Sequence, residues 1–216
     1  MDNRTCLRVK PAFSRDVPDD FPSDDLRLSE EVLSYLIERY SRPGDVIFDP
    51  FAGMGTTLLV SERLDRVAYG IERDMASWSY AQQILTNPER MIFGDVRTIG
   101  FDQLPKFSLT LSSPLYMNSD DGLDPLSGFE EAGHYSAYIR ALSEIYDAAR
   151  VHSVRGGRLI VEAANLKRNG VTTMFAWDLA RALAGKMRFE GELILDWAQY
   201  GYGFGYSHSY CLVFET

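Results

Sequence analysis

Apolar residues recur along this chain with two alternating spacings. In "LSEEVLSYLIERY" they return every three to four positions, which is typical of a helix with one buried face, and Ser29 precedes it as an N-terminal cap. The turn "RPGD" ends that helix, and the short apolar run "VIF" that follows indicates a buried strand. The same order of helix and short strand continues through most of the sequence.

The pattern predicts an α/β protein. Strands are expected at 45–48, 67–71, 90–93, 107–111, 157–163, 192–197 and 208–215. Helices are expected at about 29–41, 55–64, 74–86, 135–151 and 173–186. Strands that alternate with helices predict a doubly wound, mostly parallel sheet with helices on both faces. Only "AQYGYGFGYS" separates the last two strands, so the chain is expected to end in an antiparallel hairpin.

Two regions lie outside this alternation. Residues 1–27 are rich in proline and aspartate and are expected to form an irregular N-terminal arm. Residues 112–134 form a long connection rich in Ser, Asp and Gly, and loops of this length in compact domains are usually functional or mobile. We expect residues 28–216 to form a single domain, because a chain of 216 residues is long enough for one well-buried core.

The composition is that of an ordinary globular protein, with 45% hydrophobic and 25% charged residues. No apolar run is long enough to span a membrane, and the first residues lack the apolar segment of a secretory signal, so we expect a cytoplasmic protein. Cys6 and Cys211 lie far apart and are expected to be free thiols. Because the cysteines and histidines show no metal-ligand spacing, no metal is expected.

The first strand-to-helix turn, "VIFDPFAGMGTTLL", carries the clearest functional signal. Ligands of doubly wound sheets bind at the carboxyl ends of the strands, and Gly53 and Gly55 would let the backbone approach a ligand closely. A tight turn with glycines for geometry alone is the alternative. The first three strands end in Asp49, Glu72 and Asp95. Glu72 is suited to the two hydroxyls of a ribose and Asp95 to an adenine amino group, so adenosine is the expected ligand.

The segment "DPFAGMGTT" resembles the cofactor motif of class I S-adenosylmethionine-dependent methyltransferases, specifically the DNA and RNA amino-methyltransferases. In that group Asp-Pro-Phe-x-Gly-x-Gly-Thr is characteristic, and a Ser/Asp/Asn-Pro-Pro-Tyr motif closes the fourth strand. The resemblance covers about residues 25–118 and implies a Rossmann-like methyltransferase sheet that binds S-adenosyl-L-methionine. The cofactor-binding residues that it implies are Asp49, Pro50, Phe51, Gly53, Gly55, Thr56, Glu72, Asp95, Val96 and Ser112.

The sequence "SSPLY" follows the fourth strand and differs from the second motif at Leu115. The exocyclic amine of a base is a poor nucleophile, because its lone pair is delocalised into the ring. In the family's scheme two acceptors hold the amine and aim its lone pair; here these would be Ser113 Oγ and the Pro114 carbonyl, with Tyr116 stacked on the ring. Ser112 replaces Ser113 if the turn is shifted by one residue. A plain turn after the strand is the alternative to a catalytic motif.

Leu115 removes neither of these acceptors. It frees the conformation of Pro114, which a following proline would have held extended, at a cost of about 0.4–1 kcal/mol. That corresponds to a loss of under about tenfold in rate. The resemblance therefore implies an altered but catalytic motif, and leaves the substrate class in question.

Three classes of function remain open. The resemblance implies methylation of an amine in DNA or RNA, where a base in a duplex has to be flipped out. The aromatic residues Tyr200, Tyr202, Phe204 and Tyr206 either stack on bases or pack on the rim of a glycine-rich loop. The net charge of −9 and the lack of a large insertion for target recognition favour instead a methyltransferase for a small molecule or protein. A cofactor-binding module without catalysis is favoured only by Leu115. No membrane partner is expected, and nothing indicates the oligomeric state.

Overall fold

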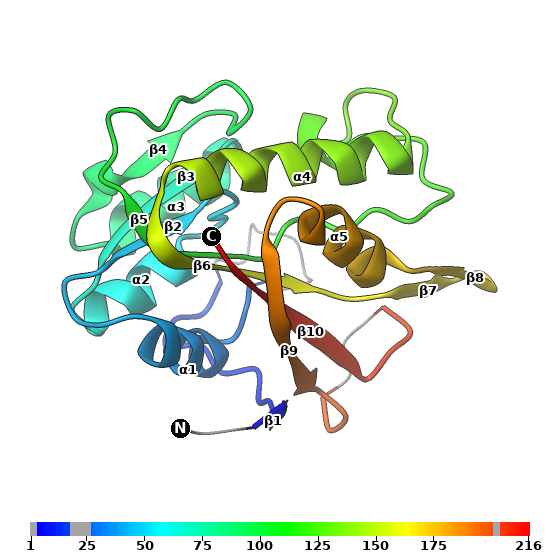
Figure 1. Ribbon diagram of the computed structural model, residues 1–216, viewed down its shortest axis with the longest axis horizontal. Coiled ribbons are helices and arrows are strands. Elements are labelled where there is room, and N and C mark those ends of the chain that lie inside the picture. Colours follow the sequence, from blue (N-terminus) through cyan, green and yellow to red (C-terminus); the bar gives the residue numbers. More distant parts are fainter. Residues whose placement is uncertain (1–3, 18–26, 201–203) are drawn as a thin grey trace.

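The structure is a computed structural model that describes residues 4–17, 27–200 and 204–216. Within these residues the central sheet has eight strands in the order β1-β9-β10-β6-β5-β2-β3-β4 (Figure 1). The strands are β1 (Cys6–Arg8), β2 (Val46–Asp49), β3 (Val67–Glu72), β4 (Met91–Phe93), β5 (Phe107–Ser112), β6 (Ser153–Ala163), β9 (Arg188–Asp196) and β10 (His208–Glu215).

Helices cover both faces of this sheet (Figure 1). The α-helices are α1 (Glu30–Tyr40), α2 (Thr56–Arg63), α3 (Met75–Ile84), α4 (Tyr135–Val151) and α5 (Phe175–Ala184). Two short 3-10 helices, η1 (Pro88–Arg90) and η2 (Pro125–Ser127), lie in the connections. Buried residues of α1, α2 and α3 belong to one hydrophobic core, and those of α4 and α5 to the other. The predicted α/β fold is thereby confirmed.

The alternation of side chains along each strand assigns them to these two cores. On β6, Leu159 and Val161 pack with α4 and α5, whereas Ile160 between them packs on the opposite side. On β10, Phe214 packs in the core with α4 and α5, and its neighbour Val213 packs in the core on the opposite side. Successive side chains of a strand point to opposite faces, so a strand buried on both faces is apolar at every position. This is why the central strands appear in the sequence as continuous apolar runs.

The carboxyl-terminal part has the predicted antiparallel hairpin. Strand β10 pairs antiparallel with β9 and also with β6, while β2, β3, β4, β5 and β6 pair in parallel with their neighbours. Both cysteines are free thiols, as expected; Cys6 is exposed and Cys211 is buried in the core.

Several elements were absent from the sequence-based expectation. Strand β1 forms within the segment expected to be irregular and pairs in parallel with β9. A small hairpin of β7 (Leu166–Arg168) and β8 (Val171–Thr173) projects beyond β6. Strands β6 and β9 begin about four residues earlier than predicted, at exposed residues. These parts are solvent-exposed or very short, so they lack the apolar pattern on which the prediction depended.

The long 112–134 connection is folded against itself and against the sheet edge. It contains η2 and an isolated bridge between Leu123 and Ala132. Asp124 caps η2 by accepting from the Leu126 backbone N–H at 2.9 Å. The segment is also tied to the β7–β8 hairpin, where Arg168 pairs with Asp120 at 3.0 Å and with the adjacent aspartate.

Candidate active site

A cavity of about 490 Å3 opens at the carboxyl ends of β2, β3 and β4, next to the end of β5. Parallel neighbouring strands end at the same edge of a sheet, so residues far apart in the sequence meet there. Most of the residues singled out in the sequence line this cavity: Asp49, Pro50, Phe51, Gly53, Thr56, Glu72, Asp95, Val96, Ser112 and Ser113. The volume is within the usual range for a site that binds a small molecule.

The two glycines of the first turn have different tasks. Gly53 lies at the cavity with φ +52°, and a Cβ at this residue would project into open space. Gly55 does not line the cavity; it precedes α2 with φ +79°, and its Cβ would come within 3.0 Å of the Ala81 Cβ. Only glycine adopts such positive φ values without strain. Gly53 therefore leaves room for a ligand, whereas Gly55 permits close packing of α2 on α3.

Asp49 is a buried acid at the end of β2, only 3% exposed. Its Oδ1 accepts from the Phe51 backbone N–H at 3.0 Å. Burial raises the pKa of Asp49 to about 6, against hydrogen bonds from Thr57, Phe51 and Ser112 that favour the charged form, and the nearby charge of Glu72 raises it further. A cationic group in the cavity would be attracted by this carboxylate.

Glu72 connects the end of β3 with the glycine turn. Its Oε2 accepts from the Gly53 backbone N–H at 2.8 Å, and its Oε1 accepts from the Asp74 backbone N–H at 2.6 Å. Burial raises the pKa of Glu72, although these two backbone donors favour the ionised form. A carboxylate has about four acceptor positions, so Glu72 keeps capacity for hydroxyl donors from the cavity.

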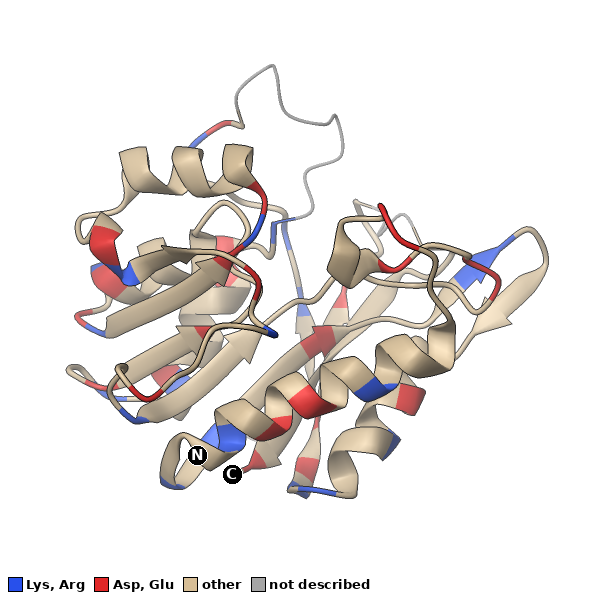
Figure 2. Cartoon of the chain, turned by 90° about the horizontal axis from the view of Figure 1, so that it is seen from above, with Lys and Arg blue, Asp and Glu red and all other residues tan. Residues whose placement is uncertain are grey.

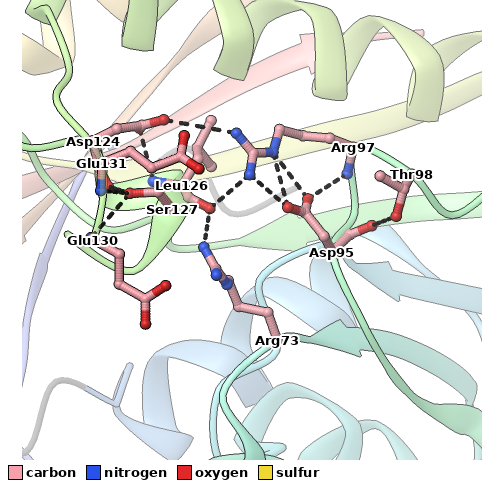
Figure 3. Close-up of polar contacts among 9 residues, drawn as sticks. All are labelled: Arg73, Asp95, Arg97, Thr98, Asp124, Leu126, Ser127, Glu130 and Glu131. Atoms are coloured by element: carbon pink, nitrogen blue, oxygen red, sulfur yellow. Dashed lines mark hydrogen bonds and ion pairs between the residues drawn. The ribbon is translucent and has the colours of Figure 1, made fainter.

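Asp95 is held by an arginine two residues later (Figure 3). The Arg97 guanidinium contacts both carboxylate oxygens, at 2.6 Å from Nη2 to Oδ2 and 3.0 Å from Nε to Oδ1. Burial opposes ionisation, but the hydrogen bonds from Arg97 outweigh it and hold the pKa of Asp95 below its usual value. Asp95 is the acid predicted from the sequence to accept from an adenine amino group, and in the structure its carboxylate also pairs with Arg97.

The same arginine joins the sheet edge to η2. The Leu126 carbonyl accepts from Arg97 Nη2 at 3.0 Å and also from Arg73, which follows β3 (Figure 3). Arg97 Nη1 lies 3.7 Å from Asp124 Oδ2. We call the contacts of Arg73 and Arg97 with the Leu126 carbonyl the arginine clamp. Because Leu126 lines the cavity, the arginine clamp fixes one wall of the cavity.

The two serines at the carboxyl end of β5, Ser112 in the strand and Ser113 directly after it, have separate partners. Ser112 is buried; its hydroxyl accepts from Tyr146 at 3.3 Å and interacts with Asp49. Ser113 is half-buried and donates its Oγ–H to Glu162 Oε2 at 2.8 Å. Ser112 therefore links β5 to β2, while Ser113 is directed toward β6.

Glu162 is a site residue that the sequence analysis missed. It is 1% exposed, and its Oε2 also accepts from the Tyr116 hydroxyl at 2.6 Å. It lies near the end of β6, in the apolar run "LIVEAA". A lone carboxylate in an otherwise apolar buried strand was the available signal, because a buried charge requires hydrogen-bond partners.

The residue that distinguishes "SPLY" from the family motif lies at the cavity. Leu115 is 44% exposed and lines it, and its carbonyl accepts from the Tyr138 hydroxyl. Pro114 is buried, and Tyr116 packs 5.1 Å from Phe175, measured between ring centroids. Neither Pro114 nor Tyr116 lines this cavity. The cavity and the expected acceptor motif thus adjoin at Ser113 and Leu115.

Among the loop aromatics that the structure describes, Phe204 lies against the motif. Phe204 packs edge-on to Tyr116 at 5.0 Å between ring centroids. Tyr206 packs 5.5 Å from His208, Tyr200 is exposed, and Tyr202 lies outside the described residues.

The described part of the chain has further features that bear on ligands. Lys and Arg are interspersed with Asp and Glu over the fold (Figure 2). Within residues 4–17, 27–200 and 204–216, no three His, Cys, Asp or Glu side chains are grouped closely enough to hold a metal ion. None of the helices in that part of the chain is long and apolar enough to cross a membrane.

Comparison with known proteins supports the sequence resemblance in the first part of the chain. Residues 25–83 match the family model described as DNA methylase. A relative, the type II methyltransferase M.BglII of Bacillus subtilis, is 33% identical over 72 residues, which are 32% of this chain and 20% of the relative. The expected resemblance is confirmed for this segment, which contains the glycine turn and Glu72. The family match ends before Asp95 and before the "SPLY" motif.

Solved structures confirm the fold over most of the chain. A methyltransferase from Pyrococcus furiosus aligns with a TM-score of 0.58 at 12% identity, over 91% of this chain and 87% of that one. Magnesium protoporphyrin IX methyltransferase from Synechocystis PCC 6803, solved with bound S-adenosylmethionine, aligns with a TM-score of 0.55 at 14% identity, over 86% and 76%. The chain therefore has the Rossmann-like methyltransferase fold.

Proposed function

We propose that this chain is an S-adenosylmethionine-dependent methyltransferase that acts on an exocyclic amine of a nucleic-acid base. The observation that carries the proposal is that the cavity reaches Ser113 of the expected acceptor motif. One cavity is lined by the acidic strand ends and the open face of Gly53, and it extends to Ser113 of the expected acceptor motif. The DNA methylase match of residues 25–83 supports the nucleic-acid substrate.

The residues present fit S-adenosyl-L-methionine. The open space at Gly53 would accept a ligand that any side chain would exclude. Glu72 would hold the ribose hydroxyls, and Asp95 with the Val96 backbone would meet the adenine. Asp49 would attract the positive charge of the cofactor, since a nearby cation stabilises the ionised form of a carboxyl group whose ionisation burial has made unfavourable. Pro50, Phe51 and Thr56 would complete the wall.

When bound, the cofactor supplies an electrophilic methyl group on a positively charged sulfur. The chain's contribution is alignment of the amine with that group. Ser113 Oγ and the Pro114 carbonyl would accept its two N–H bonds and direct the lone pair. Tyr116, which is partly exposed and held by Phe175 and Phe204, would contact the base. Orientation of the reactants would account for most of the catalysis, and the nitrogen, once its lone pair has formed the new bond, would release its extra proton to solvent.

A second candidate is a methyltransferase of the same fold that acts on a small molecule or protein. The net charge of −9 favours it, because generic nucleic-acid binding depends on positive charge. We further propose that the protein acts in the cytoplasm; the free thiols of Cys6 and Cys211 are compatible with a reducing compartment.

Calorimetry with S-adenosylmethionine, followed by transfer of labelled methyl groups to pools of DNA, RNA and protein, tests these proposals. We expect binding in the micromolar range, about −8 kcal/mol. Glu72→Ala and Asp95→Ala should each weaken it, because each leaves ligand donors without an acceptor. Absence of binding by the wild type would remove the methyltransferase proposal. Binding without transfer to any of these pools would leave a cofactor-binding module or a methyltransferase for a small molecule, and label in protein alone would favour the second candidate.

Two motif variants test the acceptor roles. Ser113→Ala should reduce turnover by about a hundredfold, because misplacing the reacting group costs on that order. Leu115→Pro should keep turnover within about tenfold of wild type, since the family's turn accommodates proline at that position. The comparison is made at saturating cofactor. The reverse ordering would mean that the loop is built around leucine and recognises something other than a base amine.

A further inference from the structure

We infer that Glu162 is a positioning residue that makes Ser113 an obligate hydrogen-bond acceptor, so that the site selects substrates that present an N–H donor. This inference rests on the proposed function and specifies how the acceptor motif works with a serine. It concerns a residue of β6 that lies outside the matched family segment.

The sheet register places Glu162 beside the motif. Strands β5 and β6 pair in parallel with Ser112 aligned to Val161, so the next residues along the chain are Ser113, directly after β5, and Glu162 on β6. Glu162 Oε2 accepts from Ser113 Oγ at 2.8 Å and from the Tyr116 hydroxyl at 2.6 Å. One oxygen thus orients both polar side chains of the motif.

The chemistry of a hydroxyl explains the need for this contact. A serine hydroxyl has one proton and two lone pairs, and a free one can rotate to donate or accept. When its proton is held by Glu162, only lone pairs remain for a ligand. A carboxylate or carboxamide oxygen accepts without such help, whereas serine requires a partner for its proton. With that partner, Ser113 would repel an acceptor atom and bind an amine.

The burial of Glu162 argues against a purely structural role. A carboxylate that is 1% exposed loses its hydration, and burying a charge is costly unless hydrogen bonds compensate for it. Cys211 of β10 lies opposite Glu162 of β6 in the sheet. Burial, together with the charge of Glu162, raises the pKa of the Cys211 thiol well above its ordinary value. The acid therefore adds electrostatic cost to the core, while its Oε2 accepts hydrogen bonds from both polar side chains of the motif.

The test compares Glu162→Met and Glu162→Gln with Ser113→Ala and the double variant Ser113→Ala/Glu162→Met. Methionine fills the volume of the side chain without an acceptor oxygen. Glutamine retains an oxygen that can accept from both hydroxyls. Glu192→Met, an exposed position on β9, is the matched control. Turnover is measured on the pool that the wild type methylates, with cofactor affinity by calorimetry and urea midpoints as checks of folding.

Glu162→Met should lose about a hundredfold in kcat while it still unfolds cooperatively in urea and keeps an unchanged cofactor affinity. Glu162→Gln should remain within about tenfold of wild type. The double variant should be no slower than Ser113→Ala by more than about threefold, because Glu162 acts through Ser113. Glu192→Met should behave as wild type.

Three results would overturn the inference while leaving the proposed function intact: wild-type turnover in Glu162→Met, a loss in Glu162→Gln as large as in Glu162→Met, or additive losses in the double variant. If Glu162→Met does not fold, Glu162→Gln and the double variant Ser113→Ala/Glu162→Gln decide the question. Turnover of Glu162→Gln within about tenfold of wild type supports the inference, and a larger loss, or losses that add in the double variant, contradicts it. A wild type that transfers methyl groups to no pool ends the proposed function and this inference together.

Discussion

Asp49 shows how much a single buried acid contributes to the behaviour of the whole protein. An ordinary aspartate has a pKa near 3.9, and a rise to about 6 on folding corresponds to about 3 kcal/mol. Because the folded state binds the proton more tightly than the unfolded state, the stabilising contribution is complete below about pH 4. It is lost as the pH rises to about 6.

We therefore expect Asp49→Asn to gain in stability relative to wild type as the pH increases. Asparagine keeps an oxygen that can accept from the Phe51 N–H and does not titrate. The difference in unfolding free energy between variant and wild type should shift by up to about 3 kcal/mol in favour of the variant between pH 4 and pH 6.5. Urea unfolding of both proteins over this range measures it. Parallel stability curves would contradict the prediction.

The two glycines of the first turn, Gly53 and Gly55, allow stability and cofactor affinity to be compared between two alanine variants. Gly55→Ala should lower the unfolding free energy by about 2–3 kcal/mol, because it combines left-handed strain with a contact to Ala81. Gly53→Ala should cost only the strain, about 1 kcal/mol, since its Cβ meets open space. The order should reverse for cofactor affinity, with the larger loss in Gly53→Ala. Equal effects of the two variants in both assays would contradict this division.

At the scale of elements, the arginine clamp decides how η2 covers the cavity. The Leu126 carbonyl is the acceptor for Arg73 and Arg97, which follow β3 and β4 (Figure 3). Three segments far apart in the sequence thus meet at one backbone oxygen. The clamp includes exposed charges, whose pairs are worth about 1 kcal/mol or less. Its effect should be local order rather than global stability.

The double variant Arg73→Ala/Arg97→Ala should release η2. Amide hydrogen exchange at residues 126–131 should accelerate by about tenfold or more, whereas the global unfolding free energy should change by about 1 kcal/mol or less. Arg140→Ala, an exposed position on α4, serves as the control. If exchange of η2 is unchanged, the other contacts of the 113–134 segment hold it without the arginines.

At the scale of the whole molecule, a sheet with two cores presents one functional edge. Five parallel strands end there, and the cavity at that edge is lined by acids although the protein already carries a net charge of −9. This charge distribution suits a cationic cofactor better than a polyanion. Any nucleic acid bound by this chain would therefore depend on a local contact near Ser113 rather than on the overall field.

The periodicity of apolar residues determined most of the fold. The helix at 135–151 and the strand at 208–215 were predicted with their observed bounds, because long amphipathic and fully buried segments carry strong patterns. Strand β1 and the β7–β8 hairpin were not predicted. Strand β1 depends on a partner distant in the chain, β9, whereas β7 and β8 pair with each other but are only three residues long; the mostly exposed residues of all three show no apolar period.

For the site, the sequence by itself determined which residues lie at the strand ends, since chemistry-bearing residues such as Glu72 directly follow apolar runs. Only the tertiary structure decided their partners. It joined Arg97, the partner of Asp95, to the Leu126 carbonyl, gave Leu115 rather than Tyr116 a place on the cavity wall, and brought Glu162 to Ser113. The physical reason is that strand register and side-chain direction arise from packing between distant segments, whereas a local motif records only the order of residues along one strand.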